Sequence, residues 1–383
     1  MREIENEPAL HAVLRAHGRL SGLRLQDLDL TGHEQALLAR TDVAGMVVLG
    51  GRISQALAAH LRTHGALIFP TDPRAPVNPY RSTLYQPHDL YAGLAEQGYE
   101  ATPDARAYHW SRDADDQHDA FATLLRAIHD DSVTDALDEF VDGVPTVGIM
   151  GGHALARGTA RYRGAALLGH RLASAGLAVV TGGGPGAMEA ANLGAFAPDE
   201  AVIEDAVQRL TSVPSFVPDV GSWATVALAV HDEIVGAAVP QGRVSSIGIP
   251  TWFYGHEPPN VFCNGIAKYF SNALREDGLL ARSTAGLVVL EGAAGTVQEI
   301  FQAATPLYYS REGAALPVVV LVGREHWTQA VPVWPALTAL ASGRAMAEHL
   351  HLVDSVDEAA EIVLATQPAR GVTRGDAPLD RLP

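Results

Sequence analysis

Short apolar runs alternate with helix-forming stretches along the chain from Val144 onward. Runs such as TVGIMGGH, LAVVTGGG and LPVVVLVG are rich in β-branched residues and bounded by glycine, which is typical of buried strands. The stretches between them, such as RYRGAALLGHRLASAG, favour helices. Strands joined by helices in this order predict an α/β fold with a Rossmann-like parallel sheet flanked by helices. Such sheets bind ligands at the carboxyl ends of their strands.

The first part of the chain is less regular, and residues 1–135 are predicted to form an N-terminal accessory α/β region. Two buried strands, Gly45–Gly51 and Gly65–Pro70, flank the helix-like run SQALAAHLRTH. The Pro-, Tyr- and Arg-rich stretch that follows, and the amphipathic helix after it, fit either a lid or a dimer surface. The Rossmann-like domain is expected over residues 136–367. Residues 368–383 have few large apolar side chains and are expected to be a disordered tail.

A glycine-rich turn follows the strand AVVT. Gly182, Gly183, Gly184 and Gly186 leave backbone N–H groups uncovered, so an anion could approach them at the start of the next helix. Glu189 falls in the first turn of that helix. The alternative is that the glycines serve a tight strand-to-helix turn and that Glu189 complements the helix dipole. Four glycines within five residues favour a ligand.

A second turn of the same kind lies in GLVVLEGAAGTVQEIFQ. Its small residues could cradle a phosphate: Gly292, Ala293, Ala294, Gly295 and Thr296. Glu299 would then be free to face a sugar. The spacing of Thr296 and Glu299 also matches a capping box, in which Glu299 would be structural. The spacing alone leaves both interpretations open.

A polar stripe is expected on a helix predicted between Val261 and Leu280. Its members recur at helical spacing: Asn264, Lys268, Asn272 and Arg275. Such a stripe is usually a solvated face, but this one includes Lys268, the only lysine in the chain. Arg275 is the predicted ligand contact because its guanidinium suits a phosphate or a base edge.

The loop Thr251–Asn260 combines Trp252, Phe253 and Tyr254 with His256 and Glu257. Its aromatic rings fit base stacking and ordinary loop packing equally well. His153, after the strand TVGIM, is likewise open to a structural or a functional role. The histidines lack zinc-like spacing, so no metal site is predicted.

Composition narrows the possible functions. The 383 residues are 47% hydrophobic, which is ample for a packed core, and the sequence shows no apolar run long enough for a membrane helix. The N-terminus lacks the apolar core of a signal peptide and Cys263 is the only cysteine, so a cytoplasmic location is expected. The net charge of −17 disfavours nucleic acid as a partner, while a small anion held by backbone amides remains compatible with it.

Together, TGGGPGAMEA and EGAAGTVQEI resemble the paired GGGxxG and PGGxGTxxE signatures of the LOG ("lonely guy") family, whose members are often mislabelled as lysine decarboxylases. The resemblance covers roughly Val144 to Gly323. The segments GIPTWFYGHEPPNVF, IAKYFSNALREDGLL and GTVQEIFQ resemble its longer, two-domain branch, which includes nucleotide 5′-monophosphate nucleosidases. One departure is that Glu291, Gly292 and Ala293 stand where the family has Pro-Gly-Gly, which adds a charge and a methyl group to the second turn.

The resemblance implies hydrolysis of the N-glycosidic bond of a nucleoside 5′-monophosphate to a free base and ribose 5-phosphate. It assigns catalysis to Glu299 and Arg275, with Glu189 as a second candidate carboxylate. It places ligand contacts in both motifs: Gly182, Gly183, Gly184, Gly186, Met188, Gly292, Ala293, Ala294, Gly295 and Thr296. It also implies a homo-oligomer, and we expect no cofactor. The alternative is a sensor or scaffold that binds a nucleotide without cleaving it, for which the altered second motif would be the mark.

Overall fold

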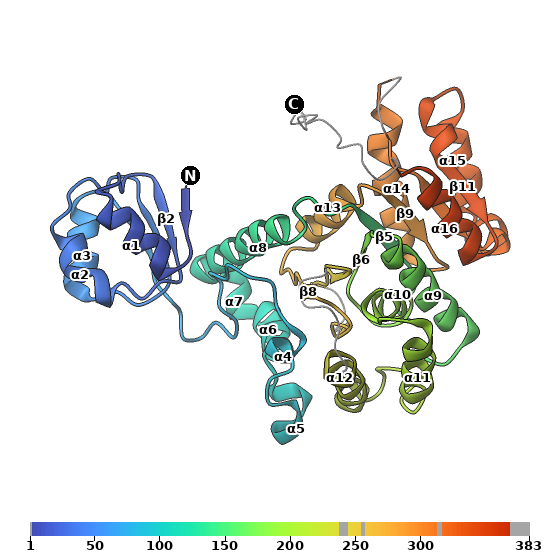
Figure 1. Cartoon of the computed structure of the whole chain (residues 1–383), viewed down its shortest axis with the longest axis horizontal. Helices are drawn as coiled ribbons and strands as arrows, with labels where there is room; N and C mark the ends of the chain where they lie inside the picture. The colour runs from blue at the N-terminus through green and yellow to red at the C-terminus, as the bar shows by residue number, and fades with distance from the viewer. Residues whose placement is uncertain (1, 237–243, 254–256, 312–315, 368–383) are drawn as a thin grey trace.

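The computed structural model describes residues 2–236, 244–253, 257–311 and 316–367 and shows two separate parallel sheets (Figure 1). The smaller sheet has the order β1-β2-β3-β4 and its own apolar core. Its elements are β1 (Arg2–Ile4), α1 (Glu7–Arg15), β2 (Leu23–Gln26), α2 (Glu34–Leu38), β3 (Val47–Leu49), α3 (Gln55–Thr63) and β4 (Leu67–Phe69). The strands predicted at Gly45–Gly51 and Gly65–Pro70, with a helix between them, are therefore confirmed.

The larger sheet has seven parallel strands in the order β11-β10-β9-β5-β6-β7-β8. Its strands are β5 (Thr146–Met150), β6 (Ala178–Thr181), β7 (Ser246–Gly248), β8 (Gly265–Ile266), β9 (Gly286–Val289), β10 (Val319–Val322) and β11 (Leu350–Val353). Most are buried on both faces, which is why they appear in the sequence as nearly continuous apolar runs. The order runs outward from β5 in both directions, so the predicted α/β fold with a Rossmann-like parallel sheet is confirmed.

Helices cover both faces of the larger sheet. α9 (Ala160–Ser174), α10 (Ala187–Phe196) and α16 (Val356–Ala365) form one layer, with α11 (Glu200–Leu210) against α9 and α12 (Val220–Gly236) against α11. α13 (Asn272–Arg282), α14 (Ala294–Tyr309) and α15 (Val333–Ala341) form the other layer, as right-handed crossovers require.

A helical segment joins the two sheets. It consists of α4 (Pro87–Leu90), α5 (Leu94–Gln97), α6 (Pro103–Arg112), α7 (Ala114–His118) and α8 (Ala120–Phe140). Apolar residues of this segment, from Leu84 to Leu137, belong to the core of the larger sheet. The predicted domain boundary at residue 135 thus falls inside α8, and Figure 1 shows the smaller sheet standing apart at the far end of α8.

The prediction of a helix between Val261 and Leu280 is wrong for its first part, because α13 begins only at Asn272. The preceding residues run in extended form at the edge of the sheet, where Ile266 exchanges backbone hydrogen bonds with Tyr85 at 2.9 and 3.0 Å. Pairing with distant backbone outweighs local helix propensity here. The predicted polar stripe therefore does not exist.

No helix in the described residues combines the length and apolar character needed to cross a membrane. The predicted disordered tail, residues 368–383, lies outside the described residues. So do Tyr254 and His256 of the aromatic loop.

Candidate functional site

The two predicted glycine turns lie on either side of strand β5. β6 and β9 both pair with β5, so the turns that follow them end at the same edge of the sheet. Gly152, just after β5, touches both turns. Its N–H donates to the carbonyl of Glu291 at 3.0 Å, and its carbonyl accepts from the N–H of Ala187 at 3.1 Å. Two motifs far apart in the sequence therefore meet where the strand order reverses, the usual ligand position in such sheets.

The turn after β6 is buried and tightly held. Gly183 and Gly186 have φ angles of 68° and 72°, a left-handed conformation that favours glycine. Asn260, which is fully buried, donates its backbone N–H to the carbonyl of Gly183 at 2.8 Å. Its side-chain nitrogen donates to the carbonyl of Gly184 at 3.1 Å. This turn has one backbone conformation, set by contacts on both sides.

Only some amides of the first turn are available to a ligand. The N–H of Gly183 donates to Thr181 Oγ1 at 2.9 Å, and the N–H of Ala187 is taken by Gly152. Within the described residues, the amides of Gly184 and Gly186 have no hydrogen-bond partner. The first turn thus offers the amides of Gly184 and Gly186 to a ligand, whereas that of Gly183 is already taken.

The turn after β9 is more open. Ala293, Ala294 and Gly295 are exposed, and α14 begins at Ala294. Thr296 is consequently the third residue of the helix and Glu299 the sixth, so the capping box that the spacing allowed does not form. That structural interpretation of Glu299 is wrong, because the helix begins too early for it.

Both helices that begin at these turns lack a side-chain cap. Three helices packed nearby do have one: α9 is capped by Thr159, α13 by Ser271 and α16 by Ser355. The first amides of a helix have no partner inside the helix. An uncapped N-terminus therefore presents free donors and a positive dipole end, and two such ends converge here.

Arg275 on α13 and Glu299 on α14 form an ion pair at the same edge. Arg275 Nη1 lies 3.1 Å from Glu299 Oε1, and the two side chains are 12% and 14% exposed. Arg275 also faces the first turn, because a Cβ built on Gly182 would lie 3.8 Å from Nη1. Its Nε is buried without a hydrogen-bond partner. The guanidinium therefore keeps one donor that no group in the described residues accepts.

The surroundings of Glu299 change the pKa of its carboxyl group. Burial raises its pKa above the usual 4.5, opposed by the ion pair with Arg275 and assisted by the negative charges of Glu276 and Glu257. Glu276 accepts from Asn272 Nδ2 at 2.7 Å and from Gln298 Nε2 at 2.6 Å, and so ties α13 to α14 beside the pair. A buried carboxylate with a raised pKa next to an arginine is typical of a functional site.

The side chains of Met188 and Glu257 lie against the glycines of the first turn. Cβ atoms built on Gly182 and Gly184 would lie 2.8 Å from Sδ and 2.9 Å from Cε of Met188, so this side chain packs on both glycines. A Cβ on Gly184 would also lie 3.2 Å from Glu257 Oε2. Glu257 accepts from His153 Nδ1 at 2.9 Å, a contact that raises the pKa of His153. Sequence spacing offers no reason to link Glu257 with His153, because the two residues lie in separate loops.

Glu189 occupies a different environment from Glu299. It is fully buried and forms a two-pronged ion pair with Arg157, whose Nε lies 3.0 Å from Glu189 Oε2. Arg157 also stacks over Trp223, with 4.5 Å between its Cζ and the ring centroid. A cavity of only about 20 Å³ adjoins the pair, room for about one water. The carboxylate of Glu189 is thus paired with Arg157 and stabilises the start of α10, on a different side of the turn from Arg275.

Lys268 does not face the glycine turns. It is buried, and its Nζ lies 2.6 Å from Asp104 Oδ1 on α6. Asp104 also accepts from Trp252 Nε1 at 2.8 Å and from the hydroxyl of Tyr99 at 2.7 Å. Trp252, one of the loop aromatics considered for base stacking, is accordingly part of the core. Phe253 beside it remains 49% exposed.

Glu291, which departs from the family pattern, is paired. Its carboxylate lies 2.6 Å from Arg161 Nη1. The charge added to the second turn is therefore compensated locally. Gly292 next to it is required by packing, because a Cβ there would lie 2.2 Å from Thr296 Oγ1.

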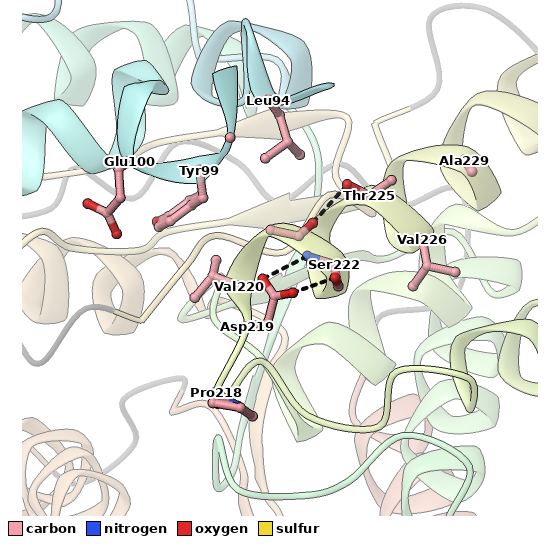
Figure 2. Close-up of a pocket in the computed structure, with 12 residues that line it drawn as sticks. Leu94, Tyr99, Glu100, Pro218, Asp219, Val220, Ser222, Thr225, Val226 and Ala229 are labelled. Atoms are coloured by element: carbon pink, nitrogen blue, oxygen red, sulfur yellow. Dashed lines mark hydrogen bonds between the residues drawn. The ribbon is translucent and has the colours of Figure 1, made fainter. Parts of the chain in front are cut away.

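A larger hollow, about 900 Å³, lies elsewhere, between the α5 region and α12. Figure 2 shows Leu94 and Tyr99 on one side and Val220, Val226 and Ala229 of α12 on the other. The charged side chains that line it, Glu100 and Asp219, are both acidic. Such a hollow repels phosphate, so its size does not make it the nucleotide site.

No protein-family model matches the chain, and no curated protein is similar enough to match. Among solved structures, the molybdenum cofactor binding protein from the phototrophic bacterium Rippkaea orientalis is similar over 58% of this chain and 96% of its own, with 16% sequence identity and a TM-score of 0.34. A likeness of this extent carries no argument about function.

Proposed function

We propose that this chain is a LOG-type nucleosidase that hydrolyses the N-glycosidic bond of a nucleoside 5′-monophosphate. The observation that carries the proposal is the largely buried Arg275–Glu299 pair, which lies at the switch point of the sheet between two uncapped helix N-termini. The helix ends would hold the phosphate and the carboxylate would face the ribose.

The expected chemistry is a substitution at the anomeric carbon. As the bond to the base nitrogen breaks, positive charge develops on the sugar, and the carboxylate of Glu299 stabilises it. Glu299 also accepts a proton from the attacking water as the new C–O bond replaces the C–N bond, and that proton then passes to the departing base, so the carboxylate is regenerated. Arg275 favours the ionised form of Glu299 and anchors the nucleotide with its free Nε.

Binding energy from the phosphate would position the sugar over Glu299. The amides of Gly184 and Gly186 and the first amides of α14 are the donors that we assign to it. These contacts lie away from the reacting bond, so they supply orientation.

The test is release of free base from each common nucleoside 5′-monophosphate, measured by chromatography with Glu299→Gln alongside. This variant keeps the shape and can still accept from Arg275, but it cannot stabilise the sugar cation. We expect turnover to fall at least about 100-fold with nucleotide binding retained. Glu204→Gln, which removes an exposed carboxylate paired with Arg163, is the matched control and should leave turnover unchanged.

Two outcomes would overturn the proposal. Nucleotide binding by the wild type without release of base from any substrate would support the sensor. Undiminished turnover in Glu299→Gln would show that another group performs the catalysis.

A further inference from the structure

Three side chains with metal-binding atoms meet between α4 and α12, apart from the glycine turns. His88 Nε2 lies 2.8 Å from Asp232 Oδ1, and His231 Nδ1 lies 2.9 Å from the same oxygen. The imidazole nitrogens and the carboxylate oxygen all lie within 4.8 Å of one another. The proposed nucleosidase chemistry uses none of these residues.

Of these three side chains, His231 is packed against the protein, whereas His88 and Asp232 are exposed to solvent. His231 is only 9% exposed, and its ring stacks on Phe196 with 5.1 Å between centroids and an interplanar angle of 19°. His88 and Asp232 are 61% and 54% exposed. Two of the three ligand atoms thus come from one long helix, with one ring fixed by packing, while an ion can enter from solvent.

The donor set fits a particular class of ion. Two imidazole nitrogens with one carboxylate oxygen suit zinc and its neighbours, whereas Mg²⁺ and Ca²⁺ prefer oxygen ligands. Ligands at about 2.0–2.2 Å from a tetrahedral zinc lie roughly 3.3–3.6 Å apart, so the two histidine–carboxylate separations of 2.8 and 2.9 Å need to open by only about half an ångström. Three protein ligands leave the fourth position for water.

We propose that His88, His231 and Asp232 bind one divalent transition-metal ion of the zinc class per chain. The ion would join α4 to α12, two segments separated by more than a hundred residues in the sequence. Such a link would tie the helical segment to the large domain beside the hollow of Figure 2.

The competing explanation is that Asp232 only accepts hydrogen bonds from the two rings. The chain offers a matched control for this. His109 and Glu100 form an exposed pair at 2.8 Å, with one histidine and one carboxylate. If an exposed histidine–carboxylate pair were enough to bind zinc in this chain, removing His109 would weaken binding as much as removing His88.

The experiment is calorimetric titration of the metal-free full chain with ZnCl₂ in a non-chelating buffer. We expect one tight equivalent, with a dissociation constant of about micromolar or lower. His88→Ala and Asp232→Asn should each weaken that step at least about tenfold, because each removes a ligand. His109→Ala should leave it unchanged, and MgCl₂ should produce no comparable binding.

Thermal unfolding supplies a second readout. Because the ion binds only the folded arrangement, ZnCl₂ should raise the melting temperature of the wild type and of His109→Ala but not of His88→Ala. Melting without zinc checks that each variant folds. Absence of a tight equivalent in the wild type, or equal binding by His88→Ala, would overturn the proposal. Base release does not enter either readout, so this result stands apart from the proposed activity.

Discussion

The turn after β6 and the turn after β9 both lead a buried strand into a helix, with a glutamate shortly after, yet their surroundings differ. The first turn is buried throughout, and its glutamate is closed off against Arg157. The second is exposed at Ala293 to Gly295, and its glutamate pairs with Arg275 at the shared edge. Similar local sequences thus form a buried, tightly packed turn after β6 and a solvent-exposed turn after β9.

One glycine from each turn, Gly186 and Gly295, makes the same distinction. A Cβ on Gly186 would lie 2.6 Å from the carbonyl oxygen of Gly152, and the backbone there has a φ of 72°. A Cβ on Gly295 would meet nothing within 4 Å. Packing explains the first glycine completely and the second not at all. Close approach of a ligand to the backbone is a reason for glycine that remains available at Gly295.

The largest effect on the first turn is expected from Gly186→Ala. The added methyl group collides with backbone that cannot move freely, and the left-handed conformation adds strain. We expect a loss of about 3 kcal/mol or more in the free energy of unfolding, measured by denaturant titration. A loss below about 1 kcal/mol would show that the first turn adapts, and the contrast between a rigid and an open turn would fail.

The Arg275–Glu299 pair makes a prediction about pH. Activity needs ionised Glu299, so kcat/KM should fall as the pH drops through the pKa of that carboxyl, which burial places above 4.5. Arg275 lowers this pKa, so Arg275→Gln should move the acid limb to higher pH and reduce turnover about 100-fold. Arg275→Lys keeps the charge and is the control, with its limb close to that of the wild type. An acid limb at the same pH in Arg275→Gln would show that Glu299 does not set it.

The smallest effect is expected from Gly295→Ala. The methyl group enters open space, and alanine favours helices over glycine, so the fold should be unchanged or up to about 1 kcal/mol more stable. If a phosphate lies against this backbone, the KM for the nucleotide should rise about tenfold, because the methyl group holds it away. Steady-state base release and denaturant unfolding on the same samples test both parts. An unchanged KM would place the phosphate on the first turn alone.

The pattern of apolar and small residues was enough to predict the architecture of the large domain and the presence of two strand–turn–helix units. Apolar runs bounded by glycine have few other ways to be buried, and strands joined by helices form parallel sheets. Glu299 could be named because it ends the second motif, and Arg275 because the resemblance places an arginine one helix upstream of that motif. Their ion pair is a consequence of α13 and α14 packing side by side.

The environments of individual side chains depend on contacts between distant segments, which only the tertiary structure shows. Spacing could not tell Glu189 from Glu299, because the difference is a partner, Arg157, that lies in another loop. Ile266, which lies in the part of the chain predicted to be helical, pairs instead with Tyr85 at the edge of the sheet. Lys268 is buried because Asp104 neutralises its charge. The histidine and carboxylate ligands between α4 and α12 come from distant segments, so no spacing rule could find them. Local pattern determines which elements form, whereas burial, pairing and charge neutralisation between distant residues determine what each side chain can do.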